Sequence, residues 1–122
     1  MALRQGLAKA EPDRADYQRD LSVSYNCLAA IAQAEGDGRA TLRYLESDLG
    51  IAELLAQREP ERADYSDDVA ISHLQLGRLL QTLHDDQDAA GHLDRARQIW
   101  EQLEATGRLP PERRAILEQL RG

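Results

Sequence analysis

Three histidines and one cysteine are the side chains of this 122-residue chain best suited to catalysis or metal binding. His84 is followed directly by Asp85 and Asp86. A His-Asp doublet on helices can hold a metal ion for hydrolysis, provided that further His and Asp ligands converge from other helices. The other histidines are His73 and His92, and the chain has no second doublet. We therefore expect Asp85 or Asp86 to cap a helix, and we predict no metal site.

Cys27 is the only cysteine, which excludes an intramolecular disulfide and favours a reducing compartment. A nucleophilic cysteine needs a neighbouring base and donors for a developing negative charge. Because Cys27 follows no glycine-rich loop, we expect a buried small apolar residue instead. The acidic pairs Asp67-Asp68 and Asp85-Asp86 lack partner spacing for catalysis and are expected to be solvated helix starts. No nucleotide-binding or calcium-binding motif occurs, so we predict no cofactor and no enzyme.

The composition indicates one helical domain. Leu and Ala dominate the apolar residues, Phe is absent, and Gln, Glu and Arg fill much of the remainder. A net charge of −7, with one lysine and arginines interleaved with acids, argues against nucleic acid as a partner. No run approaches membrane-spanning length, and the first ten residues lack the apolar core of a signal peptide. We predict an all-α, cytoplasmic protein without membrane contact.

An internal repeat organises the chain. The segment EPDRADYQRD at 11–20 recurs as EPERADYSDD at 59–68, with seven of the ten positions identical. Aligning 11–58 with 59–106 at a constant shift of 48 needs no gap, and self-similarity at such a period is typical of a helical array. We assign 11–58 and 59–106 as two repeats. Residues 1–10 resemble the tail of a preceding helix, and 107–122 hold a short capping or degenerate helix from about residue 111 to 120.

Each repeat predicts two helices of about twenty residues, because apolar residues recur every three or four positions. The four predicted apolar stripes are Tyr17, Leu21, Ser24, Leu28 and Ile31; Leu42, Leu45, Leu49, Ala52 and Leu55; Tyr65, Val69, Leu76, Leu79 and Leu83; and Ala89, Leu93, Ala96, Trp100 and Leu103. Gly36 suits the left-handed end of a helix, and Asp37 suits the cap of the next. Pro12 and Pro60 each suit the first turn of the helix that follows.

These helix pairs resemble the tetratricopeptide repeat, whose pattern places small and large residues at fixed intervals. The matching positions are His73-x2-Leu76-Gly77-x2-Leu80 and Ala89-x3-Leu93 in the second repeat, and Tyr25-x2-Leu28-Ala29-x2-Ala32 and Thr41-x3-Leu45 in the first. A period of 48 instead of about 34 implies extended helices. The stretch ADYQRDLSVSYNCL looks like a long-helix variant found in large bacterial signalling proteins.

The resemblance implies a right-handed solenoid of antiparallel helix pairs. In such a fold the first helix of each pair lines a concave groove that accepts a peptide or a helix of a partner protein. The positions that the pattern maps to this groove are Val23, Asn26, Ala30, Gln33, Ile71, Leu74, Arg78 and Gln81. The function that it implies is a protein-protein interaction module, part of a larger bacterial protein.

Two other functions are weighed against this one. Self-association, or a spacer role in a signalling protein, would use exposed leucines of the terminal helices, namely Leu3, Leu7, Leu117 and Leu120. A small helical metal-dependent hydrolase is the remote alternative. The polar run formed by Ser22, Ser24, Tyr25 and Asn26 suits either a binding surface or packing against the preceding helix. Trp100 is expected in the core, or as an anchor for a partner if it lies at an open end.

Overall fold

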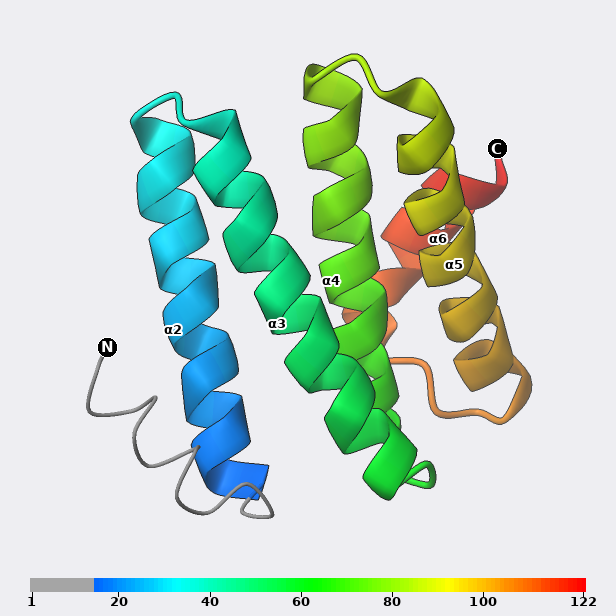
Figure 1. Cartoon of the computed structure of the whole chain (residues 1–122). Coiled ribbons are helices and arrows are strands. Elements are labelled where there is room, and N and C mark those ends of the chain that lie inside the picture. The colour runs from blue at the N-terminus through cyan, green and yellow to red at the C-terminus, as the bar shows by residue number, and fades with distance from the viewer. Residues whose placement is uncertain (1–14) are drawn as a thin grey trace.

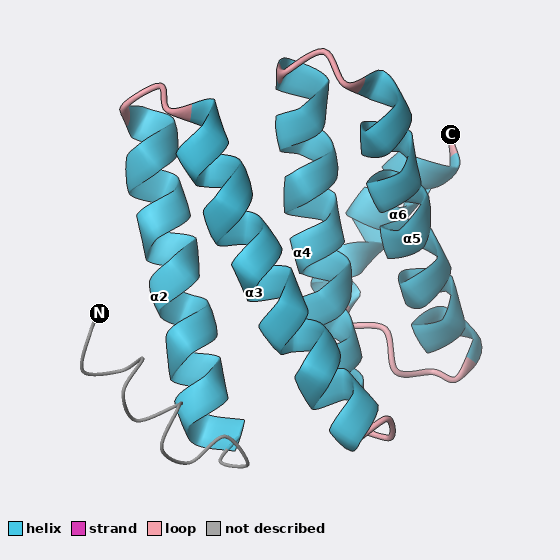
Figure 2. Ribbon diagram, in the orientation of Figure 1, coloured by secondary structure: helices cyan, strands magenta, loops and turns pink. Residues whose placement is uncertain are grey.

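Every element in the described part of the chain is a helix. The computed structural model describes residues 15–122 (Figures 1 and 2), and its elements are α2 (Ala15–Ala34), α3 (Gly38–Arg58), α4 (Ala63–Thr82), α5 (Asp86–Ala105), the short 3-10 helix η1 (Pro111–Arg113) and α6 (Arg114–Arg121). Both ends of α4, and the start of α5, lie where the repeat shift places the corresponding ends of α2 and α3. The sequence repeat therefore coincides with a repeat of helix boundaries. The tail predicted for residues 1–10 lies outside the described residues, as do Pro12, Leu3 and Leu7.

Equivalent turns connect the two helices of each pair. Asp37 caps α3 by accepting a hydrogen bond from the backbone N–H of Ala40. Asp85 caps α5 by accepting one from Asp88, which confirms the prediction of a cap after His84. Gly36 has a φ of 77°, the left-handed conformation expected at the end of α2.

The link between the two pairs corrects one expectation. The helix α3 ends at Arg58, as predicted from the proline that follows Glu59. Pro60, however, lies in a turn, and α4 begins only at Ala63 with Arg62 as its N-terminal cap. The loop is therefore longer than the repeated sequence suggested, and the backbone N–H of Arg62 closes a turn on the carbonyl oxygen of Glu59.

Removing a capping carboxylate tests the turn geometry. We expect Asp37→Ala to lower the free energy of unfolding by about 1 kcal/mol, because the N–H of Ala40 loses its acceptor. Glu35→Ala is the control, since it removes the same charge from an exposed neighbour without a capping role. Urea unfolding of both variants measures the difference. Equal stability of the two variants would refute the assigned cap.

The long helices pack one after another. The helix α2 packs against α3, α3 against α4, and α4 against α5, while α6 returns to lie against α5 (Figure 1). One apolar cluster joins α2, α3 and α4 through Ala29, Leu45, Leu76 and Leu79. A second joins α3, α4, α5 and α6, with Ala70, Ala96, Trp100 and Leu117 fully buried. The core is thus continuous across both pairs.

Small residues bring the helices of the second pair close together. A Cβ atom added at Gly77 would lie 2.7 Å from the Leu93 side chain, so α4 and α5 approach more closely there than alanine would allow. Ala89 and Ala96 are likewise buried. Gly77 and Ala89 are positions of the repeat pattern, and the backbone carbonyl oxygen of Ala89 lies 3.2 Å from a Cβ added at Gly77.

Several apolar or sulfur-containing side chains differ from their predicted environments. Cys27 is exposed, not buried, because it lies on the side of α2 opposite α3. Ile31 is 56% exposed on the same side, although the sequence pattern places it in the buried stripe. Leu83 is 44% exposed at the end of α4. Of the leucines expected to be exposed for self-association, Leu117 is fully buried in the core and Leu120 packs against the same apolar cluster.

Candidate functional site

A cavity of about 250 Å³ opens between α2, α3 and α4. The helix α2 contributes Asn26, Ala29, Ala30 and Gln33, α3 contributes Thr41 and Leu45, and α4 contributes Gln75, Arg78, Leu79 and Thr82. The first helices of the two pairs, α2 and α4, both line the cavity, together with α3, which packs against each of them. It is therefore located at the junction between the two repeats.

The floor of this cavity is apolar and its rim is polar. Ala29, Leu45 and Leu79 are all buried and belong to one apolar cluster. Arg78 is exposed, and no acidic side chain within residues 15–122 pairs with it. The side-chain carbonyl oxygen of Gln75 is buried and has no hydrogen-bond partner in that same part of the chain. Such a buried acceptor is costly unless a ligand or water supplies a donor.

Half of the predicted groove positions line this cavity, namely Asn26, Ala30, Gln33 and Arg78. Val23 instead points away from α3 and is 57% exposed on the outer side of α2. Ile71 and Leu74 pack into the second apolar cluster, so they face the core. Gln81 is exposed outside the cavity lining.

The cavity also contains residues that the sequence pattern did not assign. Gln75 and Thr82 lie one helical turn on either side of Arg78, so they were detectable as polar interruptions in a leucine-rich helix. Thr41 and Leu45 come from α3, the second helix of a pair. The pattern assigned the groove to first helices alone and for that reason missed them.

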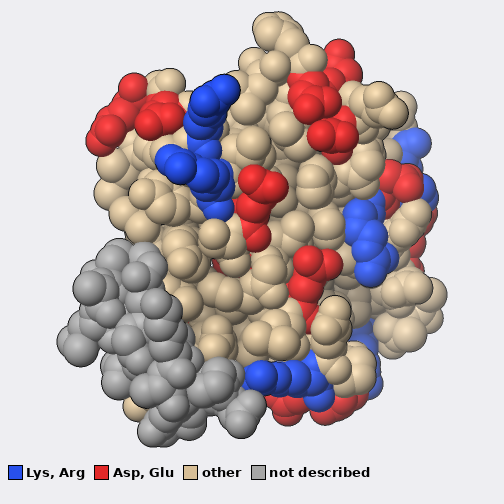
Figure 3. Space-filling view, in the orientation of Figure 1, with Lys and Arg blue, Asp and Glu red and all other residues tan. Residues whose placement is uncertain are grey.

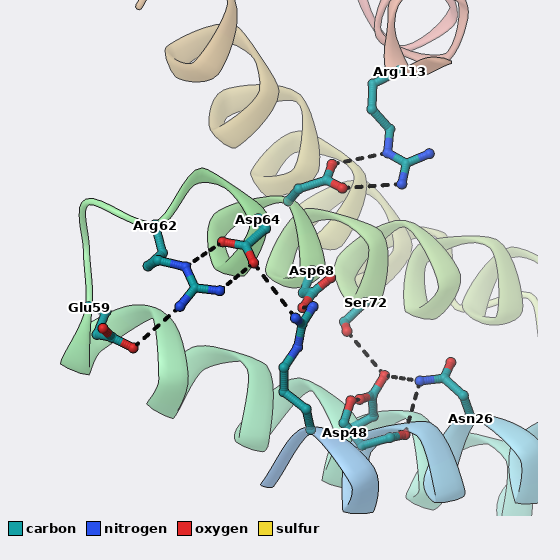
Figure 4. A network of polar contacts seen from close by, with 11 residues as sticks. Asn26, Asp48, Glu59, Arg62, Asp64, Asp68, Ser72 and Arg113 are labelled. Carbon is teal, nitrogen blue, oxygen red and sulfur yellow. Dashed lines mark hydrogen bonds and ion pairs between the residues drawn. The ribbon is translucent and has the colours of Figure 1, made fainter. Parts of the chain in front are cut away.

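The buried carboxylate of Asp48 holds Asn26, a polar residue of the cavity rim, in place (Figure 4). Asp48 of α3 is 2% exposed and accepts hydrogen bonds from Ser22 and Asn26 of α2 and from Ser72 of α4. The Asn26 amide nitrogen lies 2.7 Å from one oxygen of this carboxylate. Two residues of the polar run, Ser22 and Asn26, thus bond to α3, the following helix, and Asn26 also lines the cavity. Asn26 is oriented by Asp48 and is only one edge of the cavity.

A second buried carboxylate lies near the other end of α4. Asp67 is 7% exposed, accepts a hydrogen bond of 2.8 Å from the Trp100 indole N–H, and binds Arg113 through both of its oxygens. Hydrogen bonding to Asp67 raises the pKa of the Arg113 guanidinium above its usual value. The expectation of a solvated acidic pair is therefore wrong for Asp67. Its partner Arg113 lies in η1, so this ion pair joins η1 to α4.

Two histidines pair between α4 and α5. The Nδ1 atoms of His73 and His92 are 2.9 Å apart, so one imidazole donates its proton to the other. Tyr25 and Tyr44, which are their counterparts in the first repeat, make the equivalent ring contact with centroids 6.3 Å apart. The pair is therefore an interhelical contact of the repeat. Within residues 15–122, no three His, Cys, Asp or Glu side chains are grouped closely enough to hold a metal ion.

The histidine pair makes stability depend on pH. Burial, assisted by the charges of His92 and Arg95, lowers the pKa of His73 to about 4. Its ordinary pKa is about 6.5. Between these two pKa values, His73 is protonated in the unfolded chain and neutral in the folded chain. The stabilisation is complete above about pH 6.5 and is lost as the pH falls toward 4. We expect His73→Gln to reduce the drop in stability between about pH 7 and pH 5, measured by urea unfolding. An unchanged drop would contradict this assignment.

Charge on the visible face does not mark out a nucleic-acid surface. Figure 3 shows acidic and basic side chains interleaved over this face. Several of the chain's arginines are engaged in ion pairs, such as Arg19 with Asp68 and Arg62 with Asp64. None of the helices in residues 15–122 is both long enough and apolar enough to cross a membrane.

Comparison with known proteins identifies no relative, because no protein family, no curated protein and no solved structure matches the chain.

Proposed function

We propose that the chain is a non-catalytic protein-interaction module built as a tetratricopeptide-like right-handed solenoid, acting in the cytoplasm as part of a larger bacterial protein. Three features support this architecture: helix boundaries that recur at the shift of the sequence repeat, equivalent caps at Asp37 and Asp85, and packing of each long helix on the next. Stacked helix pairs form a rigid scaffold on which side chains of a groove keep fixed positions.

The cavity between α2, α3 and α4 carries the functional part of the proposal. Within residues 15–122, it combines an apolar floor with an arginine that has no counter-charge and a buried amide oxygen that lacks a donor. A peptide segment satisfies all three features, since it offers apolar atoms, a carboxylate for Arg78 and an N–H for Gln75. A volume of about 250 Å³ accommodates one side chain of such a peptide. The expected ligand is therefore a peptide or helix with an acidic side chain at its centre.

Selection from a displayed peptide library tests this function. We expect acidic peptides to be enriched, and we expect Arg78→Ala to weaken the selected peptide about tenfold to a hundredfold, because a hydrogen bond to a charged group is lost. Arg114→Ala is the matched control, since Arg114 is an exposed arginine of α6 that lies outside the cavity. Titration calorimetry gives the affinities. Equal weakening by both variants, or selection of no peptide, would refute the proposal.

A further inference from the structure

One side of α2 presents an apolar stripe to solvent. Val23, Cys27, Ile31 and Ala34 follow one another at spacings of three and four residues and are all exposed. The isoleucine and valine are each more than half exposed. The helix α3 packs along the other side of α2, so the stripe, named here the outer face, faces away from the rest of the described chain (Figure 1).

The internal repeat shows what covers such a face. The positions of α4 that are equivalent to the outer face are Ile71, Gln75, Leu79 and Thr82. Leu79 is buried in the cluster that contains Leu45 of α3, and Ile71 packs against the core. On α4, therefore, the second helix of the preceding pair, α3, packs against the two apolar positions of this face, whereas Gln75 and Thr82 line the cavity. The same face of α2 has an apolar character that fits an equivalent helix.

The start of the face is acidic, as is the equivalent part of α4. There Asp68 is bound at 2.7 Å by Arg19 of α2, the first helix of the preceding pair, and Asp64 lies 3.6 Å from the same guanidinium (Figure 4). The residue equivalent to Asp68 is Asp20, which is exposed at the start of the outer face. Glu35 ends the face, and the described charged side chains that α2 exposes most are acidic.

From these observations we propose that the outer face of α2 docks an amphipathic helix of a partner protein, with a leucine and alanine stripe and basic residues next to Asp20. A second copy of the chain does not fit. An antiparallel pair of α2 helices would place Asp20 beside the partner's acidic Glu35, and a parallel pair would place two Asp20 side chains together. The docking surface and the cavity use different residues of α2, since no residue of the outer face lines the cavity. Docking at the outer face does not require a ligand in the cavity.

Cys27 reports on this face because it is the only thiol and lies at the centre of the stripe. The rate of its reaction with a maleimide is measured on the full chain across protein concentrations. We expect fast labelling at every concentration. Slow labelling throughout would show that residues 1–14 cover the face, and slowing that increases with concentration would show a second copy. Either outcome would overturn the proposal.

A synthetic peptide then serves as the partner helix. It copies Gly38–Arg58, which covers the equivalent face of α4, with Glu53→Lys and Gln57→Lys placed near its C-terminus. The helices α3 and α4 run antiparallel, so the C-terminus of α3 lies beside the start of α4 (Figure 1). The C-terminus of the peptide should therefore lie beside Asp20. We expect this peptide to slow labelling at least about fivefold, and we expect a control peptide with Gln57→Glu and Arg58→Glu to have little effect.

Protein variants test whether the peptide binds at the outer face. Ile31→Gln should abolish the protection, and Asp20→Asn should weaken it, since each removes one part of the proposed contact. Leu54→Gln, an exposed leucine of α3 that is 37% accessible, is the control and should leave the protection unchanged. Protection that survives Ile31→Gln, or that neither peptide produces, would refute the docking surface.

Discussion

Replacing Asp67 with alanine is expected to lower the free energy of unfolding by roughly 3–5 kcal/mol. The substitution leaves the Trp100 indole N–H and the Arg113 guanidinium without an acceptor in a region from which water is largely excluded. Because a domain of this size has a total stability of only about 5–15 kcal/mol, the variant should be close to unfolding. Trp100 is the only tryptophan, so its fluorescence during urea unfolding measures the change directly.

Asp67→Asn distinguishes the contribution of the Trp100 hydrogen bond to stability from that of the Arg113 ion pair. The amide oxygen still accepts from Trp100, whereas the charge that holds Arg113 is removed, so the loss should be smaller than for alanine. In a double-mutant cycle, Asp67→Ala and Arg113→Ala together should destabilise less than the sum of the single changes. A loss below about 1 kcal/mol for Asp67→Ala would show that the buried contact does not stabilise the fold.

The second large effect is expected at Asp48. Asp48→Ala should lower the free energy of unfolding by about 3 kcal/mol, because donors from Ser22, Asn26 and Ser72 lose a charged acceptor at once. The helix itself tolerates alanine there, since the equivalent residue of α5 is Ala96. The loss therefore reports on the hydrogen bonds.

Hydrogen exchange should locate this effect at the junction of the two repeats. Asp48 is the one buried carboxylate in the described chain that bonds to both α2 and α4, so amides of α2 should lose protection more than amides of α5. Ser47→Ala changes an exposed neighbour and is the control. Uniform loss of protection along all helices, or a stability equal to that of Ser47→Ala, would contradict the assigned role.

Much of the fold was predictable because local chemistry determines it. Gly36, Asp37 and Asp85 signal helix ends through backbone conformation and capping, which depend only on neighbouring residues. The position of Pro60 was predicted less well, because residues 59–62 form a turn closed by the Arg62 N–H on the Glu59 carbonyl, and α4 begins only at Ala63.

The environments of single side chains were harder to predict. Asp67 resembles any acidic residue near a helix start, and its burial depends on Arg113, which lies far along the chain. Cys27 and Ile31 continue an apolar pattern, but their exposure depends on which helix lies beside α2. Periodicity identifies a helix face without identifying what covers it.

The candidate site was predicted in part for the same reason. Asn26, Gln33 and Arg78 lie on helix faces that the repeat pattern assigns to a groove, and the structure brings them around one cavity. Thr41 was missed because the contribution of α3 depends on how deeply it lies between its neighbours. The buried oxygen of Gln75 has no sequence signal, since its lack of a partner within residues 15–122 is a property of the packed structure.

The central claim is that the cavity between the two repeats binds a peptide, and chemical-shift mapping by NMR tests it most directly. A library-selected acidic peptide is titrated into the isotope-labelled full chain. The account predicts that the shifts concentrate on Gln33, Thr41, Gln75 and Arg78, and that intermolecular contacts reach Leu45 and Leu79. Shifts concentrated on α5 and α6, or contacts that avoid these cavity residues, would contradict it.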